Sequence, residues 1–212
     1  MRILIFGASG RTGGELVRQA LERAYTVSVF TRIANRVTPA ESLNVIVGDV
    51  GDKDAVSKAV AGHDAVVSVL GVGRALRHDQ VVIDGVGHIV SAMAEQGVRR
   101  LVYQSFIGVP DSRAAVGFVL RRIAPIPLRH EIADHVAKEA LVRASGLDWT
   151  IVRPPKLNEG PYTGRYLDGE HISTRKPVPM LSRADAADFI LRSLDNPLTV
   201  GKVMRLLPGT RA

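Results

Sequence analysis

The sequence contains no cysteine among its 212 residues. This absence excludes disulfide bridges, thiolate nucleophiles and cysteine-ligated metal sites, and it is compatible with the cytoplasmic location that we expect. The six histidines do not replace cysteine as metal ligands, because they are scattered along the chain. His130 and His135, for example, lie five residues apart, a spacing that puts them on different faces of a helix. We therefore expect no metal site.

Long hydrophobic runs are also absent. No apolar stretch reaches the roughly 18 residues that a membrane-spanning helix needs, so we expect no contact with a membrane. The N-terminal segment 1–7 carries one positive charge and a short apolar run. It leads directly into a glycine-patterned turn and lacks the cleavage site that is typical of a signal peptide. We interpret it as part of the folded domain.

Aromatic residues make up only 5% of the chain, and no stripe of basic residues is interleaved with them. The formal net charge is +7, from 28 Lys and Arg against 21 Asp and Glu, but the basic residues are spread along the chain. Scattered charge is more typical of a solvated surface than of a nucleic-acid interface, so we expect no nucleic-acid partner. The composition, with 46% hydrophobic and 23% charged residues, is that of a globular protein. We interpret residues 1–212 as a single domain.

Short apolar segments alternate with helical patterns over the first two-thirds of the chain. The clearest helical pattern runs along one apolar face from Val82 to Met93 and is closed by Gly97. Apolar strands separated by helices predict a mostly parallel sheet, buried on both faces and doubly wound by right-handed crossovers. The predicted class is therefore α/β, a Rossmann-type sheet flanked by helices. Further helices are predicted over residues 12–23, 52–61 and 132–144, and strands over 2–6, 26–30, 44–47, 64–70, 100–103 and 149–152.

The pattern changes after Pro154. Residues 157–181 are rich in glycine, proline and polar side chains, and we interpret them as a small excursion on the substrate side with at most short strands. Ser182 followed by Asp185 resembles a capping box at the start of a helix. A last short strand is predicted over 202–207.

A glycine-rich turn follows the first predicted strand and opens the first predicted helix. Segment 7–13, GASGRTG, has glycines at three-residue intervals. The first glycine permits a tight exit from the strand, the second lets the backbone approach a pyrophosphate, and the third lets the helix pack closely on the strand. The helix start then offers free N–H groups to phosphates. The residues predicted to bind a dinucleotide here are Gly7, Ser9, Gly10, Arg11, Thr12 and Gly13.

The end of the second predicted strand discriminates between nicotinamide cofactors. NAD-selective sites usually carry an acidic residue there, which bonds the ribose 2′-hydroxyl. This chain has Arg32, with Arg36 nearby. An arginine suits a 2′-phosphate by its charge and by its bidentate fork. We therefore expect NADP(H) to be preferred, with NAD(H) as the alternative cofactor.

Two later strand ends are expected to reach the same cofactor. Asp49 and Val50 follow the third strand, where the carboxylate would accept from the adenine amino group and the valine would pack on the ring. The alternative is that Asp49 is a turn residue leading into the next helix. Leu70, Gly71 and Gly73 follow the fourth strand and are expected close to the ribose, although such glycines also suit any tight turn.

These segments together resemble a known family. The likeness extends over nearly the whole chain and is to atypical short-chain dehydrogenases/reductases. Within these, the chain is most similar to the NAD(P)H-binding branch that contains biliverdin-IXβ reductase/flavin reductase and bacterial NADH-flavin reductases. The segments that carry the resemblance are 7–13 (GASGRTG), 48–50 (GDV), 64–66 (DAV), 145–155 (SGLDWTIVRPP), 160–164 (GPYTG) and 182–187 (SRADAA).

The resemblance implies a reduced nicotinamide cofactor and hydride transfer to a flavin or a tetrapyrrole-like acceptor. It implies that Ser105 lies beside the nicotinamide, and that Pro154 and Lys156 lie over its other side. Typical members use Tyr-x-x-x-Lys. Lys138 fits the lysine, but Asp134 stands at the tyrosine position, where a carboxylate would be ionised near neutral pH and a poor proton donor. The expected catalytic residues are Ser105, Lys138 and Lys156.

These departures separate the hypotheses about function. Asp134 argues against carbonyl–alcohol chemistry and sugar epimerisation, and Lys156, where the branch often has histidine, argues against tetrapyrrole reduction. Flavin reduction needs the least from side chains, because the cofactor carries the hydride and water can supply the proton. We expect an NADP(H)-dependent reductase, monomeric or homodimeric, of a planar small-molecule acceptor such as FMN or a quinone, with Lys156 and Arg153 stabilising the electron-rich acceptor. The alternative is a redox sensor that binds NAD(P)H without turnover, which the missing tyrosine also favours.

Overall fold

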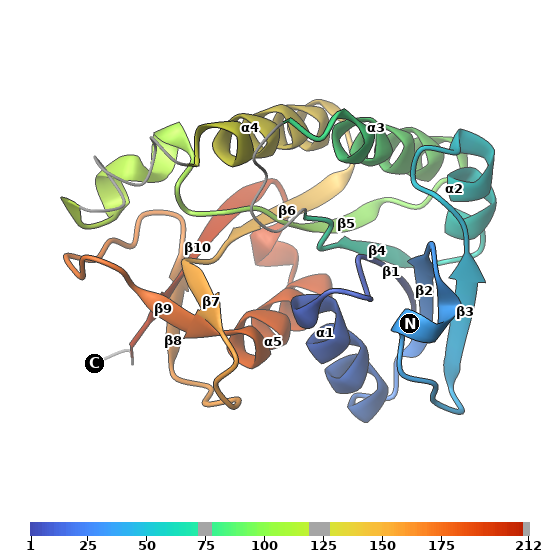
Figure 1. Cartoon of the computed structure of the whole chain (residues 1–212), viewed down its shortest axis with the longest axis horizontal. Helices are drawn as coiled ribbons and strands as arrows, with labels where there is room; N and C mark the ends of the chain where they lie inside the picture. The colour runs from blue at the N-terminus through green and yellow to red at the C-terminus, as the bar shows by residue number, and fades with distance from the viewer. Residues whose placement is uncertain (72–77, 119–127, 210–212) are drawn as a thin grey trace.

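The computed structural model describes residues 1–71, 78–118 and 128–209, in which helices cover both faces of a central sheet (Figure 1). Within these residues, eight strands form the sheet in the order β3-β2-β1-β4-β5-β6-β10-β8, and β7 pairs separately with β9. Neighbouring strands of the large sheet are parallel except for β10 and β8. The strands are β1 (Arg2–Phe6), β2 (Thr26–Thr31), β3 (Leu43–Val47), β4 (Ala65–Ser68), β5 (Arg100–Gln104), β6 (Asp148–Arg153), β7 (Lys156–Asn158), β8 (Tyr166–Gly169), β9 (Met180–Ser182) and β10 (Lys202–Pro208).

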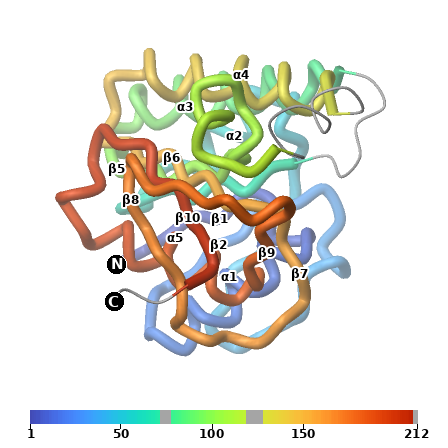
Figure 2. The backbone as a smooth tube through the Cα atoms, turned by 90° about the vertical axis from the view of Figure 1, so that its left-hand side faces the viewer, coloured from blue at the N-terminus to red at the C-terminus, as the bar shows by residue number. Residues whose placement is uncertain are grey.

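The helices divide between the two faces of the sheet (Figure 1 and Figure 2). Helices α2, α3 and α4 lie over one face, and α1 and α5 lie over the other. The α-helices described are α1 (Arg11–Glu22), α2 (Lys53–Val60), α3 (Gln80–Glu95), α4 (Arg129–Ala144) and α5 (Arg183–Leu194), and the short 3-10 helices are η1 (Ala34–Arg36), η2 (Pro110–Ala115) and η4 (Pro197–Thr199).

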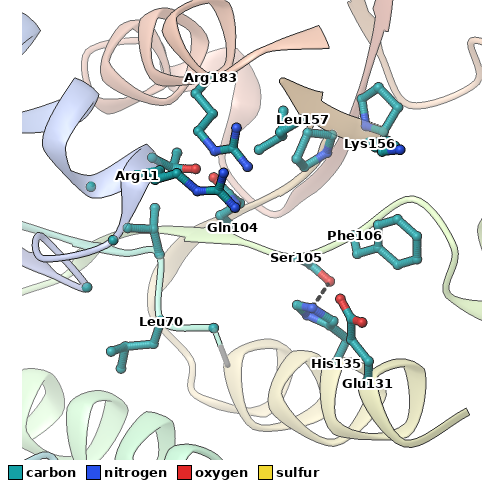
Figure 3. Close-up of a pocket in the computed structure, with 18 of the residues that line it drawn as sticks. Arg11, Leu70, Gln104, Ser105, Phe106, Glu131, His135, Lys156, Leu157 and Arg183 are labelled. Atoms are coloured by element: carbon teal, nitrogen blue, oxygen red, sulfur yellow. Dashed lines mark hydrogen bonds between the residues drawn. The ribbon is translucent and has the colours of Figure 1, made fainter. Parts of the chain in front are cut away.

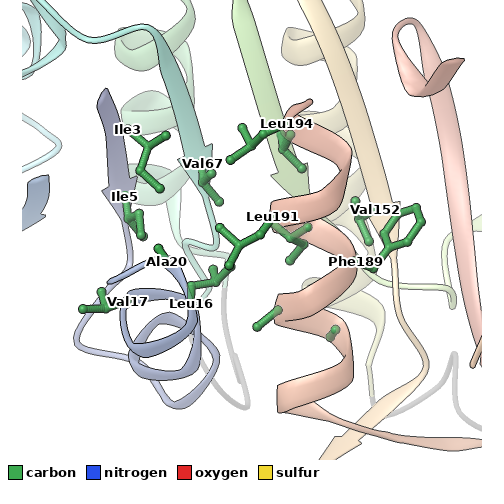
Figure 4. Packing of buried hydrophobic residues seen from close by; sticks show 14 of the residues in the cluster. Ile3, Ile5, Leu16, Val17, Ala20, Val67, Val152, Phe189, Leu191 and Leu194 are labelled. Atoms are coloured by element: carbon green, nitrogen blue, oxygen red, sulfur yellow. The ribbon is translucent and has the colours of Figure 1, made fainter. Parts of the chain in front are cut away.

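Strand side chains alternate between the two helical layers, because successive residues of a strand point to opposite faces of the sheet. In β1, Ile3 and Ile5 pack in the cluster under α1 and α5 (Figure 4), whereas Leu4 and Phe6 pack in the cluster under α2 and α3. All four side chains are fully buried. This burial on both sides explains the continuous apolar runs of the strands and confirms the predicted doubly wound, mostly parallel sheet.

Helices α1 and α5 lie side by side and run in the same direction. Gln19 Nε2 donates to the carbonyl oxygen of Ala184 (2.8 Å), and one turn further along both helices Arg23 pairs with Asp188. Leu16 of α1 belongs to the same buried cluster as several residues of α5 (Figure 4). The two helices therefore begin on the same side of the molecule, where β1 ends.

Helices α2 and α5 begin with a side-chain cap, and the cap of α5, Ser182, was predicted from the sequence. Asp52 Oδ1 accepts from two amides of the first turn of α2 (3.0 Å each), and Ser182 Oγ accepts from the amide of Asp185 at the start of α5 (2.9 Å). The predicted capping box is only half formed, however. The Asp185 carboxylate accepts instead from the amides of Thr163 (2.8 Å) and Gly164 (2.9 Å), and so ties the 157–181 excursion to α5.

The excursion holds more strand than the sequence predicts. Its flanks β7 and β9 pair with each other in parallel, and β8 within it adds an antiparallel strand beside β10. Strands of three or four residues are too short to show a period, so the sequence did not predict these pairings. The fourth strand ends at Ser68 rather than at residue 70, and α4 begins at Arg129 rather than at residue 132. No helix in the described ranges has both the length and the apolar character needed to cross a membrane.

The order of the sheet reverses at β1, which lies between β2 and β4. The chain leaves β1 for α1 on one face, and the helix that follows β4, α3, lies on the other face. Because the two connections diverge, a crevice opens at the carboxyl ends of these strands, where ligands of such sheets bind.

Candidate functional site

A cavity of about 640 Å³ opens at this crevice (Figure 3). Its walls come from the turn after β1, the segment after β4, the end of β5, helix α4 and the residues after β6. The structure thus brings the glycine turn together with all three expected catalytic residues. The predicted site residues that line the cavity are Gly7, Gly10, Arg11, Thr12, Gly13, Leu70, Gly71, Ser105, Lys138, Pro154 and Lys156.

The glycines around the cavity are of two kinds. Gly7 has a φ of +89°, and a Cβ on Gly13 would lie 2.1 Å from the carbonyl oxygen of Gly7, so the turn and its packing on α1 require both glycines. Among the described residues, a Cβ on Gly10 would have one atom within 4 Å, the carbonyl oxygen of Gly7 at 3.3 Å, and a Cβ on Gly71 would have none. The packing of the described residues therefore demands glycine less strictly at these two positions, both of which line the cavity.

Two further features fit a dinucleotide in this cavity. The first turn of α1 has no side-chain cap, so its amide N–H groups are available to an anion. Gln104 Oε1, at the end of β5, is buried and has no hydrogen-bond partner among the described residues, and Gln104 lines the cavity. Because buried polar atoms nearly always have a partner, this oxygen is positioned to accept from a bound ligand.

Arg32 and Arg36 lie beside the end of β2 and are not part of the cavity lining. Both are exposed, and neither guanidinium has a hydrogen bond or an ion pair with any other described residue. Two arginines, four positions apart in the sequence and without partners among the described residues, suit a 2′-phosphate. Their contact with the cofactor stays a prediction.

The remaining predicted cofactor contacts lie elsewhere. Asp49 Oδ1 accepts from the backbone N–H two residues further on (2.8 Å), and Val50 packs against Gly85 of α3. Both residues thus have structural roles, and their contact with an adenine ring stays a prediction. Ser9 is exposed and does not line the cavity, and Gly73 lies outside the described residues.

Helix α4 forms the wall opposite the glycine turn. Glu131, His135 and Lys138 share one face of this helix, at i, i+4 and i+7, and all three line the cavity. Figure 3 shows Glu131 and His135 on this face. Only Lys138 was predicted from the sequence. The histidines were considered above only as metal ligands, whereas the helical spacing of His135 relative to Lys138 is the signal that places it in the site.

Ser105 and His135 form a polar pair at the centre of the cavity (Figure 3). The Ser105 amide donates to the carbonyl oxygen of Val152 (2.8 Å), which fixes the buried serine at the end of β5. Its Oγ lies 3.4 Å from Nδ1 of His135. Burial lowers the pKa of His135 to about 3, and the charges of Lys138 and Arg153 act in the same direction. The imidazole is therefore neutral around pH 7.

Lys138 is a buried lysine on the face of α4 that lines the cavity. Its exposed fraction is 2%, and no hydrogen bond or ion pair joins its Nζ to another described residue. Burial lowers the pKa of Lys138, while the carboxylates of Asp134, Asp79 and Glu131 oppose that shift. Burial also raises the pKa of Glu131. An ammonium group that is out of water needs a partner, and the cavity is the open space next to it.

Asp134 stands at the tyrosine position of the typical family motif and has both carboxylate oxygens engaged. Its Oδ1 lies 2.6 Å from Nδ1 of His78, and its Oδ2 accepts from the amide of Asp79 (3.1 Å). Burial alone would raise the pKa of Asp134, but these hydrogen bonds and the charges of His78 and Lys138 hold it below the usual value. The carboxylate is ionised at neutral pH and is a poor proton donor, in agreement with the expectation from the sequence.

Arg153 does not have the role expected for it beside an electron-rich acceptor. Its exposed fraction is 3%, and its guanidinium donates to Glu139, to Asp111 (2.6 and 3.1 Å) and to Ser112 (2.6 Å). These carboxylates and the hydroxyl engage its donors, so Arg153 fastens η2 to α4. It is a structural residue, because a buried charge keeps partners of its own.

The fold, the glycine turn, the uncapped helix start and the unpaired acceptor define a dinucleotide-binding protein of the Rossmann type. Residues 7–197 match the NAD(P)H-binding family. The chain belongs to this family. In the part of the chain that the structure describes, no three histidine, cysteine or acidic side chains gather as they would around a metal ion.

Comparisons with known proteins agree with this assignment. The chain is 25% identical over 218 residues to an uncharacterized sugar epimerase, YhfK, of Bacillus subtilis (strain 168), covering 99% of this chain and 95% of that one. It is 35% identical over 185 residues to a 3-diazoavenalumate denitrifying reductase of Streptomyces sp, covering 80% of this chain and 60% of the relative. Among solved structures, ChuY, an anaerobillin reductase from Escherichia coli O157:H7, matches with a TM-score of 0.83 at 22% identity, over 98% of this chain and 97% of that one. At that identity, the match shows a common fold.

Proposed function

We propose that the protein is an NADP(H)-dependent oxidoreductase that reduces a planar acceptor such as a flavin or a quinone. The observation that carries the proposal is one cavity that joins the glycine turn to the polar wall of α4. The start of α1 suits a diphosphate, and the Ser105 end of the cavity suits the nicotinamide and the acceptor. Bound NADPH supplies the hydride, so the chain itself has to bind, orient and exclude water.

The side chains at the Ser105 end provide these functions. Ser105 and His135 offer a neutral hydrogen-bonding pair that orients a carbonyl or carboxamide group. Phe106 lies beside His135, with ring centroids 6.3 Å apart, and gives the cavity a flat apolar surface. Lys138 and Lys156 place positive charge on two sides of the cavity, which stabilises an acceptor that gains electrons.

The engaged carboxylate of Asp134 argues against reactions that need an acid–base tyrosine. Oxidation of alcohols and epimerisation of sugars both rely on such a group, so the name of the Bacillus relative does not transfer to this chain. The names of the Streptomyces relative and of ChuY favour a reductase. Reduction of a flavin or a quinone needs no protein acid, because water can deliver the proton.

The second candidate function is an NAD(P)H-binding sensor. The observation that favours it is the same Asp134, which leaves the cavity without the usual catalytic acid. A sensor would bind the reduced and oxidised cofactors with different affinities and would not turn over.

The test combines cofactor binding with turnover. We expect the dissociation constant for NADPH to be at least about tenfold lower than that for NADH, a difference of about 1.4 kcal/mol, and Arg32→Ala to remove this preference. NADPH oxidation is then followed with FMN, menadione and biliverdin. Turnover of FMN or menadione supports the reductase, whereas binding without turnover of any acceptor supports the sensor. Absence of binding of either nicotinamide dinucleotide would refute both.

Lys138→Met tests the polar wall. Because methionine matches the length of lysine without its charge, we expect kcat with FMN to fall by about tenfold or more while the protein remains folded. An unchanged kcat would show that the buried ammonium group does not act on the acceptor.

A further inference from the structure

Two arginines at the mouth of the cavity share one carboxylate. Arg11 is the first residue of α1, and Arg183 is the first residue of α5. Both donate from Nη1 to the same oxygen, Oε1 of Glu159, at 2.9 and 2.6 Å. Their side chains lie next to each other above Gln104 (Figure 3), and both line the cavity.

The sequence places these three residues together through strand pairing. Asn158 of β7 is in register with Ser182 of β9, so Glu159 and Arg183 are the residues that directly follow two paired strands. The strand pairing therefore brings Glu159 and Arg183 together. Arg11, at the start of the neighbouring helix α1, reaches them with an exposed side chain.

The carboxylate does not saturate this pair of guanidinium groups. Each guanidinium has five N–H donors, whereas Glu159 offers one oxygen to both. Arg183 is largely buried, with its side chain 14% exposed, and Glu159 is its only ionic partner among the described residues. The Arg11 and Glu159 side chains are 74% and 60% exposed, so water and salt weaken their contact.

We propose that Arg11 and Arg183 form an anion subsite that Glu159 fills in the free protein and that a phosphate group of the bound ligand takes over. The diphosphate of a dinucleotide, or the terminal phosphate of FMN, carries up to two negative charges against one on a carboxylate, and it can accept from both guanidinium forks at once. The proposal rests on the proposed function only in that the ligand is the cofactor or the acceptor of that reaction.

Two ligands can bring this phosphate. Arg11 directly follows Gly10 of the glycine turn, which favours the diphosphate of the dinucleotide. A phosphate on the acceptor, as in FMN, is the other source. The two are separated by comparing NADPH binding with the relative binding of FMN and riboflavin, which differ only in the phosphate.

The experiment measures equilibrium binding, so it does not depend on turnover. Dissociation constants are determined by calorimetry for NADPH and by quenching of flavin fluorescence for FMN and riboflavin. We expect Glu159→Gln to tighten binding of the phosphate-bearing ligand about threefold to tenfold, because it removes the internal competitor. Arg183→Gln is expected to weaken binding about tenfold or more, and Glu159→Gln should give a smaller gain in the Arg183→Gln background, where only Arg11 remains to be released.

Two control variants test for a general effect of charge, and Arg11→Gln tests the subsite without changing a buried side chain. Arg165→Gln and Glu170→Gln each remove one positive or one negative charge from the 157–181 excursion, away from the cavity lining, and their dissociation constants should stay within about twofold of wild type. Arg11→Gln changes an exposed side chain, so it leaves folding intact even where Arg183→Gln does not, and it should weaken the same ligand.

The pattern of changes identifies the source of the phosphate. Weaker NADPH binding with an unchanged ratio of FMN to riboflavin affinity assigns the subsite to the cofactor. If NADPH binding is unchanged and the ratio of FMN affinity to riboflavin affinity falls toward one, the subsite belongs to the acceptor.

Three results would overturn the subsite. The first is unchanged binding of both ligands in Arg11→Gln and Arg183→Gln. The second is weaker binding in Glu159→Gln, and the third is a wild-type protein that binds neither NADPH nor FMN. Loss of turnover alone would refute the reductase and leave the subsite standing.

Discussion

The two ends of the cavity are built by different means. At the α1 end, one contiguous segment supplies the site through its backbone, with glycines where a side chain would clash or block the space. At the α4 end, side chains from α4, the end of β5 and the residues after β6 meet in three dimensions. The first kind of site is encoded locally, and the second depends on how distant elements pack.

Two buried basic residues at the α4 end, Arg153 and Lys138, differ in whether the protein gives them hydrogen-bond partners. Arg153 and Lys138 are 3% and 2% exposed, yet Arg153 is surrounded by hydrogen-bond acceptors and Lys138 has none among the described residues. A buried charge that the protein satisfies is structural, and one that it leaves unsatisfied beside a cavity is available to a ligand. The α4 end therefore contains both a structural ion pair, Arg153–Glu139, and a buried lysine beside the cavity that has no partner among the described residues.

The largest expected effect on stability comes from breaking the buried Arg153–Glu139 ion pair. Glu139→Ala removes the buried carboxylate that faces Arg153 and leaves the guanidinium partly unpaired. We expect the free energy of unfolding to fall by about 3–5 kcal/mol, measured by urea denaturation. Arg143→Ala is the control, because Arg143 contacts the same Glu139 from a side chain that is 40% exposed, and it should cost about 1 kcal/mol or less. Equal losses would show that the α4 end does not depend on the buried pair.

An intermediate effect is expected at the glycine turn. Gly13→Ala places a Cβ 2.1 Å from the Gly7 carbonyl oxygen, so the turn has to shift. We expect a loss of about 1–3 kcal/mol in unfolding free energy, together with weaker NADPH binding. Gly14→Ala is the matched control, because a Cβ there meets no atom within 4 Å. It should stabilise the exposed helix by up to about 1 kcal/mol. Similar behaviour of the two variants would contradict a backbone-built site.

The smallest effect is a pH dependence at the α4 end. Folding lowers the pKa of His135 to about 3 from about 6.5 in the unfolded chain. Between these values the unfolded state binds more protons, so the stability that neutral His135 provides is lost as the pH falls from about 6.5 toward 3. His135→Asn removes this titration. The variant should lose less stability than wild type between pH 7.5 and 5, by at most about 2 kcal/mol, or a few degrees in Tm. If the unfolding free energies of wild type and His135→Asn changed with pH in the same way, the imidazole of His135 would not be excluded from water.

The same division explains what could be predicted from the sequence. The apolar strands and amphipathic helices fixed the doubly wound sheet, and GASGRTG located one end of the cavity, because both signals are local. Lys138 was found only through a family motif. His135 and Glu131 were missed, because their role depends on which face of α4 turns toward Ser105. Arg153 was assigned to the acceptor because the sequence did not show that Asp111 and Glu139 would surround it.

The 157–181 excursion contains strands that sequence patterns could not predict. Its strands β7 and β9 are three residues each and have no period of their own. They exist because they pair with each other across more than twenty intervening positions, a non-local contact that propensity cannot reveal. The Glu159–Arg183 contact follows from that pairing and was equally invisible in the sequence.

The parallel packing of α1 and α5 has a kinetic consequence. The uncapped start of α1 carries partial positive charge from its aligned peptide dipoles, and Arg11 and Arg183, the first residues of the two helices, both line the cavity. A polyanionic ligand approaching from solution therefore meets a focused positive field before it makes any contact. Its rate of association should fall as salt is added, more steeply than its rate of release rises.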